Sequence, residues 1–198
     1  LTRPNETRLW ERLEELPRAN TGRVFLTQDS GRPSGPENLF VLKVFDAAHG
    51  RNRRFVEVME QESVAALGFQ HPFSAATIEA ATVGERPHVV RALVDGMPIG
   101  ALLDAIRSQQ GHLPWEHVVL LGAQLFELLT AAQRVDPRSE TTRLCHGHLS
   151  PASVYVTWAG HIEVVGLGFG RSRSALPVGA RQLPFRAPEL LLGESISS

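Results

Sequence analysis

Residues 146–168 hold the motifs that decide the fold: a polar loop of sequence His146-Gly147-His148-Leu149-Ser150-Pro151-Ala152-Ser153-Val154, and a later segment of sequence Ile162-Glu163-Val164-Val165-Gly166-Leu167-Gly168. Between them, residues 154–157 and 161–165 are rich in β-branched residues, and Ala159-Gly160 is typical of a turn. The spacing therefore predicts a loop, a β-hairpin and a second loop, in that order.

The first loop resembles the catalytic loop of protein kinases, H-R-D-L-K-P-x-N followed by an aliphatic residue, because the histidine, leucine and proline are all present. Gly166-Leu167-Gly168 follows at the spacing of the D-F-G motif, and Phe185-Arg186-Ala187-Pro188-Glu189 resembles the A-P-E motif. The downstream half of the chain thus carries three kinase-like motifs in kinase order.

Upstream motifs agree with this resemblance. Phe40-Val41-Leu42-Lys43 resembles the V-A-I-K strand, and residues 16–25 resemble the glycine-rich hairpin that covers the ATP phosphates. In that hairpin only the third motif glycine, Gly22, is present, and Val24 follows it.

Glu62 lies nine residues before His71-Pro72, where kinases of the bacterial serine/threonine type have the helix glutamate that pairs with the strand lysine. Each motif alone is weak, but six motifs in one order over residues 16–189 make the likeness specific. The chain resembles the pseudokinases of the protein-kinase-like superfamily.

The resemblance implies an α+β, bilobal fold of the protein-kinase type. A small antiparallel-sheet N-lobe is expected in residues 1–95 and a partial, mainly helical C-lobe in residues 96–198. Kinase-like folds continue through several more helices, so the C-lobe is expected to be truncated after the A-P-E-like segment. A protein partner is then expected to cover the surface from Glu189 to Leu192.

Four positions of the resemblance lack the residue that phosphotransfer uses. They are His148 for the catalytic Asp, Ser150 for the following Lys, Ser153 for the metal-binding Asn and Gly166 for the metal-binding Asp. Phosphoryl transfer depends on a metal ion that neutralises developing charge, and Mg²⁺ prefers anionic oxygen ligands. The sequence therefore predicts a domain with no metal ion, no cofactor and no phosphotransfer.

The vestigial nucleotide-binding residues of the resemblance are Gly22, Val24, Lys43 and Glu62. Lys43 is expected to pair with Glu62, either to grip a nucleotide phosphate or only to tie the helix to the sheet. Pro17, at the first motif glycine, removes an N–H donor and stiffens the phosphate loop. Purine binding without magnesium remains open.

Two further clusters allow more than one interpretation. Cys145, His146 and His148 suggest a metal site, but structural zinc sites use four ligands, so a structural role for His146 in supporting the two loops is favoured. Arg171 and Arg173 lie beside serines, which fits either a phosphorylated activation segment or a disordered loop.

Composition narrows the class of protein. A formal net charge of −1, with 42% hydrophobic and 21% charged residues, argues against disorder and against a general nucleic-acid surface. No apolar run reaches the roughly 18 residues of a membrane helix. The single cysteine favours a reducing compartment, so a cytoplasmic location is expected. Because the first residue is Leu1, the chain is expected to be a piece of a longer product.

Periodicity and turn residues predict the secondary structure. The expected helices are residues 7–15, 55–67 and 113–135; the expected strands are residues 23–28, 39–45, 74–83 and 88–94, with a flexible connection at 29–36 and an interlobe hinge near Ala92.

These observations predict a catalytically inactive pseudokinase domain that acts as a regulatory protein-binding or scaffold module. Two alternatives stay open: a nucleotide-binding sensor without phosphotransfer, and an atypical ATP-dependent transferase that uses His148 as its base.

Overall fold

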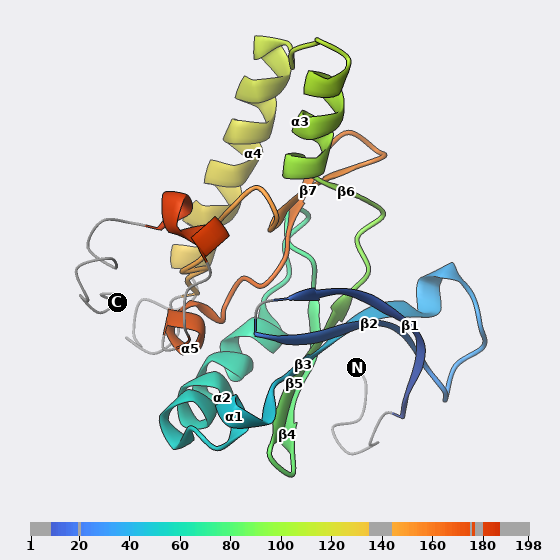
Figure 1. Ribbon diagram of the computed structural model, residues 1–198, viewed down its shortest axis with the longest axis vertical. Coiled ribbons are helices and arrows are strands. Elements are labelled where there is room, and N and C mark those ends of the chain that lie inside the picture. The colour runs from blue at the N-terminus through green and yellow to red at the C-terminus, as the bar shows by residue number, and fades with distance from the viewer. Residues whose placement is uncertain (1–8, 20, 135–143, 175, 177–179, 187–198) are drawn as a thin grey trace.

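The computed structural model describes residues 9–19, 21–134, 144–174, 176 and 180–186. Within these residues the chain forms a five-stranded antiparallel sheet, in the lower part of Figure 1, and a three-stranded sheet above it. The larger sheet has the order β1-β2-β3-β5-β4, and its strands are β1 (Trp10–Ala19), β2 (Gly22–Asp29), β3 (Leu39–Phe45), β4 (Thr77–Val83) and β5 (Arg86–Ala92).

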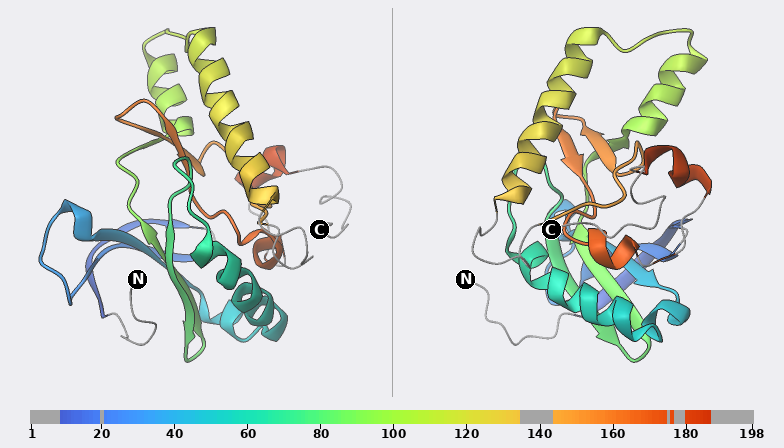
Figure 2. Two further views of the ribbon diagram at one scale, coloured as in Figure 1. Left: turned by 180° about the vertical axis from the view of Figure 1, so that it is seen from behind. Right: turned by 90° about the vertical axis from the view of Figure 1, so that its left-hand side faces the viewer.

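The smaller sheet has the order β6-β7-β8, with strands β6 (Gly96–Pro98), β7 (Val154–Thr157) and β8 (Ile162–Val164). Helices α3 (Ile99–Ser108) and α4 (Trp115–Gln133) stand above it and run side by side, with a gap between them, in the right-hand view of Figure 2. The remaining described helices are α1 (Ala47–Gly50), α2 (Arg53–Gly68) and α5 (Gly170–Ser174), with 3₁₀ segments η1 (Pro36–Asn38) and η2 (Ala180–Phe185).

Helix α2 confirms the helix expected at residues 55–67. Asn52 caps its start by accepting a hydrogen bond from the backbone N–H of Phe55, which satisfies one of the free amides of the first turn. Phe55, Met59 and Ala66 then repeat at helical spacing on the buried face. The helix packs against β4 and α5.

One apolar core joins the two sheets. Phe55 and Met59 of α2 lie in the same buried cluster as Leu128 of α4 and Ile162 and Val164 of β8. The backbone contributes as well, because the N–H of Val164 donates to the carbonyl of residue 73 and the carbonyl of Val164 accepts from the N–H of residue 75. Burial of this shared apolar surface holds the sheet-containing and helical parts together.

The predicted helix at residues 7–15 is wrong, because Trp10–Ala19 is strand β1; residues 7 and 8 lie outside the described part. The charged residues here suggest a helix, but as an edge strand they face solvent, and Glu15 forms an ion pair with Arg23 of β2. Pairing with β2 along the whole strand outweighs the small helix preference of these residues.

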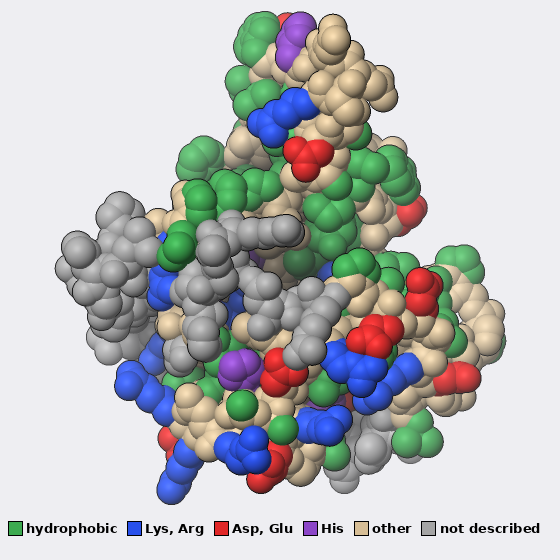
Figure 3. All heavy atoms as spheres, viewed as in Figure 1, with side chains coloured by type: hydrophobic (Ala, Val, Ile, Leu, Met, Phe, Trp, Pro, Cys, Tyr) green, Lys and Arg blue, Asp and Glu red, His purple; other side chains and the backbone are tan. Residues whose placement is uncertain are grey.

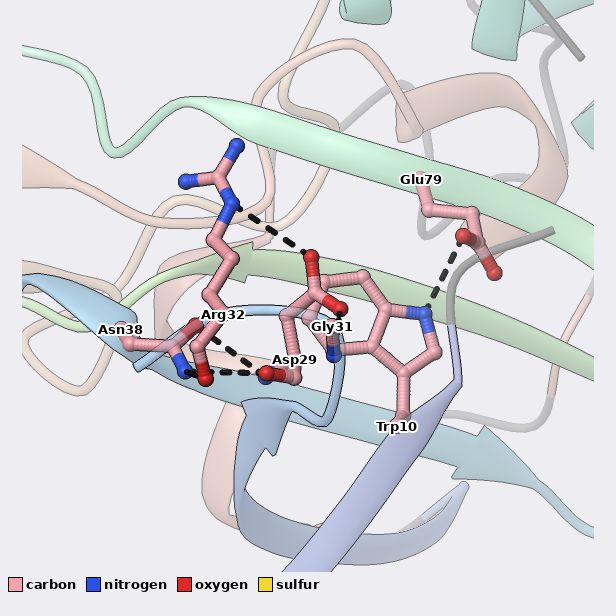
Figure 4. A network of polar contacts seen from close by, with 6 residues as sticks. All are labelled: Trp10, Asp29, Gly31, Arg32, Asn38 and Glu79. Atoms are coloured by element: carbon pink, nitrogen blue, oxygen red, sulfur yellow. Dashed lines mark hydrogen bonds and ion pairs between the residues drawn. The ribbon is translucent and has the colours of Figure 1, made fainter. Parts of the chain in front are cut away.

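Trp10 anchors β1 across one face of the sheet (Figure 4). Its ring packs edge-on against Phe40 of β3, with centroids 5.2 Å apart, and its Nε1 donates to Glu79 of β4 at 3.1 Å. This side chain therefore links the two edge strands of the five-stranded sheet over a second apolar cluster that includes Phe25 and Val90.

The connection between β2 and β3 is mostly exposed, as expected, but side chains hold its ends (Figure 4). The buried Asn38 donates to the carbonyl of Asp29 and accepts from its N–H, at 2.9 and 3.2 Å. The Asp29 carboxylate in turn accepts from the N–H of Gly31 and pairs with Arg32. These contacts hold the two ends of the connection together where it joins β2 and β3.

Other boundaries differ slightly from the sequence-based expectation. The strand expected from residue 74 begins at Thr77, because the backbone of residues 73–75 pairs with β8 of the other sheet. The strand expected at residues 88–94 is β5, which ends at Ala92, the predicted hinge position. Among the described helices, none combines the length and apolar character needed to cross a membrane.

We expect Phe55→Ala to lower the free energy of unfolding by about 3–5 kcal/mol, because Phe55 is fully buried and packs edge-on against Phe45 in the core that joins the two sheets. Urea denaturation followed by tryptophan fluorescence measures the change. Val64→Ala, on the exposed side of the same helix, serves as the control and should change stability by less than about 0.5 kcal/mol. Equal effects of the two substitutions would contradict this core.

Candidate functional site

A cavity of about 240 Å³ lies between the two sheets. The five-stranded sheet contributes Val24, Lys43 and Arg91 to its wall. The loops around the three-stranded sheet, together with α5, contribute Ser150, Ser153, Gly166 and Arg173. Two of the four residues predicted as a vestigial nucleotide site, Val24 and Lys43, thus meet three of the four positions predicted to be catalytically degenerate in one place.

Lys43 is held among other positive charges. Burial, and then the charges of Arg173 and Arg91, lower the pKa of Lys43 to about 7, and only the more distant effect of Asp46 opposes them. Its ammonium lies 4.6 Å from the centroid of the Phe45 ring, which is a favourable but modest contact for a cation. Near neutral pH a substantial fraction of Lys43 is therefore uncharged.

Glu62 is buried and has partners other than Lys43. One carboxylate oxygen accepts from the N–H of Arg171 at 2.8 Å and the other from the N–H of Ser172 at 2.9 Å. Burial raises the pKa of Glu62, while these hydrogen bonds act in the opposite direction. The expected Lys43–Glu62 ion pair does not form among the described residues; the Glu62 carboxylate instead accepts from the backbone of α5.

Gly22 has a structural reason to be glycine. A Cβ at this position would lie 2.1 Å from the carbonyl oxygen of Val44 on the adjacent strand, so any larger residue would force β2 and β3 apart. Gly22 and Glu62 are not among the described residues that line the cavity. The close approach of two strands, rather than contact with a phosphate, explains this glycine.

Gly166 and Arg173 are neighbours in the cavity wall. Gly166 has a φ of +83°, and a Cβ built on it would lie 2.9 Å from a guanidinium nitrogen of Arg173. Burial lowers the pKa of Arg173, and the charge of Glu62 partly restores it. A side chain at position 166 would thus meet a cation at the point where kinases hold their metal ligand.

The hydroxyl of Ser153 serves the loop itself. It donates to the carbonyl of Ser150 and accepts from the N–H of Ser150, both at 2.9 Å. The described cavity wall contains no Asp or Glu, so the donors suited to Mg²⁺ are lacking and the cationic surroundings would repel it. The residues present do not fit a magnesium site.

His146 supports the two loops, as the sequence suggests. Its Nε2–H donates to the carbonyl of Val165 at 2.9 Å, and its Nδ1 accepts from the N–H of His148 at 3.3 Å. Burial and the charge of Arg173 lower the pKa of His146 to about 3, so the ring is neutral at pH 7. Both ring nitrogens are used, which leaves none for a metal ion.

The other members of the possible zinc cluster are equally unsuited. Burial, and then the charge of Glu62, raise the pKa of Cys145 to about 11, so its thiol is not ionised near neutral pH. Burial and the charge of Arg173 lower the pKa of His148 to about 4. No group of three His, Cys, Asp or Glu side chains within the described residues could hold a metal ion.

The chain has no significant match among protein-family models or curated proteins, but solved structures do resemble it. A PknI kinase domain of Mycobacterium tuberculosis matches with a TM-score of 0.69 and 22% identity, over 95% of this chain and 65% of that one. The chain has a protein-kinase-like fold.

Two more PknI structures agree. A double mutant of the same kinase domain gives a TM-score of 0.72 at 21% identity, over 95% of this chain and 68% of that one. Another structure of the PknI kinase domain gives a TM-score of 0.71 at 20% identity, over 100% of this chain and 71% of that one. These matches confirm the predicted bilobal α+β fold of the protein-kinase type and, at this identity, they show the fold alone.

Two charged residues of the cavity wall, Arg91 and Arg173, lie outside the kinase-like motifs and were not predicted as site residues. Arg91 carries a signal, since it is a cation directly after the apolar pair Val89-Val90 within a central strand, where charged residues are rarely buried. Arg173 carries none, because its place in the cavity depends on residues 170–174 forming a short helix against Glu62. Local sequence does not predict that contact.

We expect a double-mutant cycle of Lys43→Met and Glu62→Gln to show a coupling energy below about 0.5 kcal/mol, because the two side chains are not paired.

Glu62→Ala should lower the free energy of unfolding by about 1–3 kcal/mol, since two amides lose their acceptor. Lys43→Met should be neutral or stabilising, because it removes a crowded cation.

Urea denaturation gives all of these values. Glu60→Gln, an exposed glutamate on the same helix, is the matched control and should leave stability unchanged. A coupling energy above about 1 kcal/mol between positions 43 and 62 would show that the ion pair exists after all.

Proposed function

We propose that this chain is a pseudokinase domain that does not transfer phosphate and that regulates a partner protein by binding it. The observation that carries the proposal is the composition of the cavity wall, in which the described residues include Lys43, Arg91 and Arg173 but no carboxylate. Phosphoryl transfer in kinases depends on Mg²⁺ to neutralise charge on the transferred group. A site with this wall favours anions and disfavours divalent cations.

His148 is a poor substitute for a catalytic base. A general base works best when its pKa is near the working pH, and the pKa of His148 is lowered to about 4 by burial and by Arg173. His148 is also not among the described residues that line the cavity. These facts argue against the alternative of an atypical transferase that uses this histidine.

A binding role is supported by apolar surface on the helical part of the molecule. A groove of about 420 Å³ between α3 and α4 is lined by Leu103, Val118 and Leu121, with Phe185 of η2 at its end. Green apolar side chains gather in this upper part of Figure 3, whereas most of the visible Lys and Arg side chains lie lower. Contiguous exposed apolar surface of this kind is common at protein interfaces.

The surface from Glu189 to Leu192, where a partner is expected from the sequence, lies outside the described residues. Among the described residues, the proposed binding surface is therefore the α3–α4 groove.

With radiolabelled ATP and either Mg²⁺ or Mn²⁺, we expect no incorporation of label above the level given by the Lys43→Ala variant, because the described cavity wall lacks the carboxylates that bind such metal ions. An active protein kinase assayed in parallel establishes the sensitivity. Incorporation that Lys43→Ala abolishes would refute the inactive assignment.

The binding role predicts that a partner is retained when the chain is purified under mild conditions from cells that produce it, and that Val118→Asp reduces the retained amount at least tenfold. A charge placed in an apolar interface costs several kcal/mol unless it is paired. Quantitative mass spectrometry after cross-linking measures the partner. Val64→Asp, on the exposed side of α2, is the control, and equal loss with both variants would contradict binding at the groove.

A further inference from the structure

Three cationic side chains from three separate elements face the interlobe cavity: Lys43 from β3, Arg91 from β5 and Arg173 from α5. The carboxylates that act on them electrostatically are Asp46 for Lys43, Glu163 for Arg91 and Glu62 for Arg173, and none of the three lines the cavity. Like charges gathered in a cavity raise the free energy of the folded chain, because each repels the others in a medium that screens poorly. Such a cluster is stable only when something compensates the charge.

The protein supplies only part of that compensation. Arg91 donates to the carbonyl of residue 92 at 3.1 Å and lies over the Tyr155 ring at 5.8 Å. Burial lowers the pKa of Arg91, as it does that of Arg173, although Tyr155 and Glu163 raise it again. A guanidinium has five N–H donors, which is more than Arg91 uses for the carbonyl of residue 92 and for its side-chain hydrogen bond with Tyr155.

The nearby carboxylates do not fill this need. Glu62 influences Arg173 electrostatically, but its two oxygens accept from backbone amides of α5. Asp46 acts on Lys43 from outside the cavity wall. The polar groups of the cavity wall are therefore mainly cationic, while Val24, Val41 and Val89, which are cross-strand neighbours of Lys43 and Arg91, make the rest of the five-stranded sheet's wall apolar.

This combination selects a particular kind of ligand. Guanidinium groups bind phosphate through two parallel hydrogen bonds, and a neighbouring ammonium adds a point charge. Apolar walls lower the local dielectric constant and strengthen these attractions. At about 240 Å³ the cavity is slightly smaller than most sites for drug-sized molecules, which suits a small anion or the charged end of a larger one.

The position of Arg173 also determines what happens to metal ions. One of its guanidinium nitrogens lies 2.9 Å from where the Cβ of a side chain at position 166 would be, so the protein's own cation is next to that position. A phosphate group in the cavity would meet this guanidinium instead of a bound metal ion. Free Mg²⁺ would then compete with the protein for the anion rather than help it to bind.

We propose that Lys43, Arg91 and Arg173 form a binding site for a phosphate-bearing anion that is held directly by the protein, without a metal ion. The proposal goes beyond the pseudokinase assignment and does not depend on whether a partner binds the α3–α4 groove. It assigns binding roles to two residues, Arg91 and Arg173, that correspond to none of the kinase-like motifs.

Isothermal titration calorimetry in EDTA tests the site with ATP, inorganic pyrophosphate and adenosine. We expect ATP and pyrophosphate to bind and uncharged adenosine to give no measurable heat. Excess Mg²⁺ should weaken the binding of both anions, which is the opposite of the behaviour of a metal-dependent nucleotide site. Equal affinities for ATP and pyrophosphate would indicate recognition of phosphate alone, and tighter binding of ATP would indicate that the nucleoside also enters the cavity.

Variants identify the residues. Arg173→Gln and Arg91→Gln should each raise the dissociation constant for pyrophosphate at least tenfold. Arg171→Gln is the matched control, because Arg171 lies two residues away on the same short helix but does not line the cavity, and it should leave the affinity unchanged. Circular dichroism melting shows whether each variant is folded.

A measurement on the unmodified chain covers the case in which a variant does not fold. Addition of pyrophosphate should shift the Nε–Hε resonances of Arg91 and Arg173 in a nitrogen–proton correlation spectrum, and leave that of the exposed Arg107 in place. The proposal is refuted if no anion binds at millimolar concentration in EDTA, if binding requires Mg²⁺, or if these two resonances do not move. None of these results decides whether the chain transfers phosphate, which the assay with radiolabelled ATP tests separately.

Discussion

Two backbone N–H groups of α5, those of Arg171 and Ser172, donate to the carboxylate of Glu62 on α2, and the arrangement of the cavity depends on this contact. The contact joins segments more than a hundred residues apart and holds the short helix α5 against α2, the long helix of the N-terminal part. The Glu62 carboxylate is directed at the backbone of α5 and forms no ion pair with Lys43 among the described residues. The same contact holds α5 where Arg173 lines the cavity beside Gly166.

The electrostatics of the cavity follow from that geometry. A kinase holds a divalent cation between carboxylates and phosphate, whereas here the protein provides the positive charge through its own side chains. The repulsion between these cations is seen at Lys43, whose pKa is lowered to about 7 by burial and by Arg173 and Arg91. In our proposal, the interlobe cavity of this kinase-like fold holds an anion directly instead of a metal-bound nucleotide.

Sequence patterns predicted much of the fold because many of its elements have local causes. The capped helix α2, the β7–β8 hairpin and the strand that carries Lys43 follow from periodicity and turn residues. Strand β1 was not predictable in this way, because its charged sequence favours a helix and only pairing with β2 makes it a strand. Helix α3 has no strong start signal, since Pro98 at its N-cap makes no side-chain hydrogen bond.

The amino-acid sequence alone determined that kinase-like motifs occur in order, and it predicts Gly166, Ser153 and His148 at the positions of catalytic and metal-binding residues, because the identity of a side chain decides whether it can ligate a metal ion or carry a proton. Only the tertiary structure decided that Glu62 binds α5 instead of Lys43, that Gly22 is required by the close approach of β3, and that Arg91 and Arg173 face the same cavity. The reason is distance along the chain: these contacts join segments that the core brings together, and no local pattern encodes which of several possible partners a buried charge will meet.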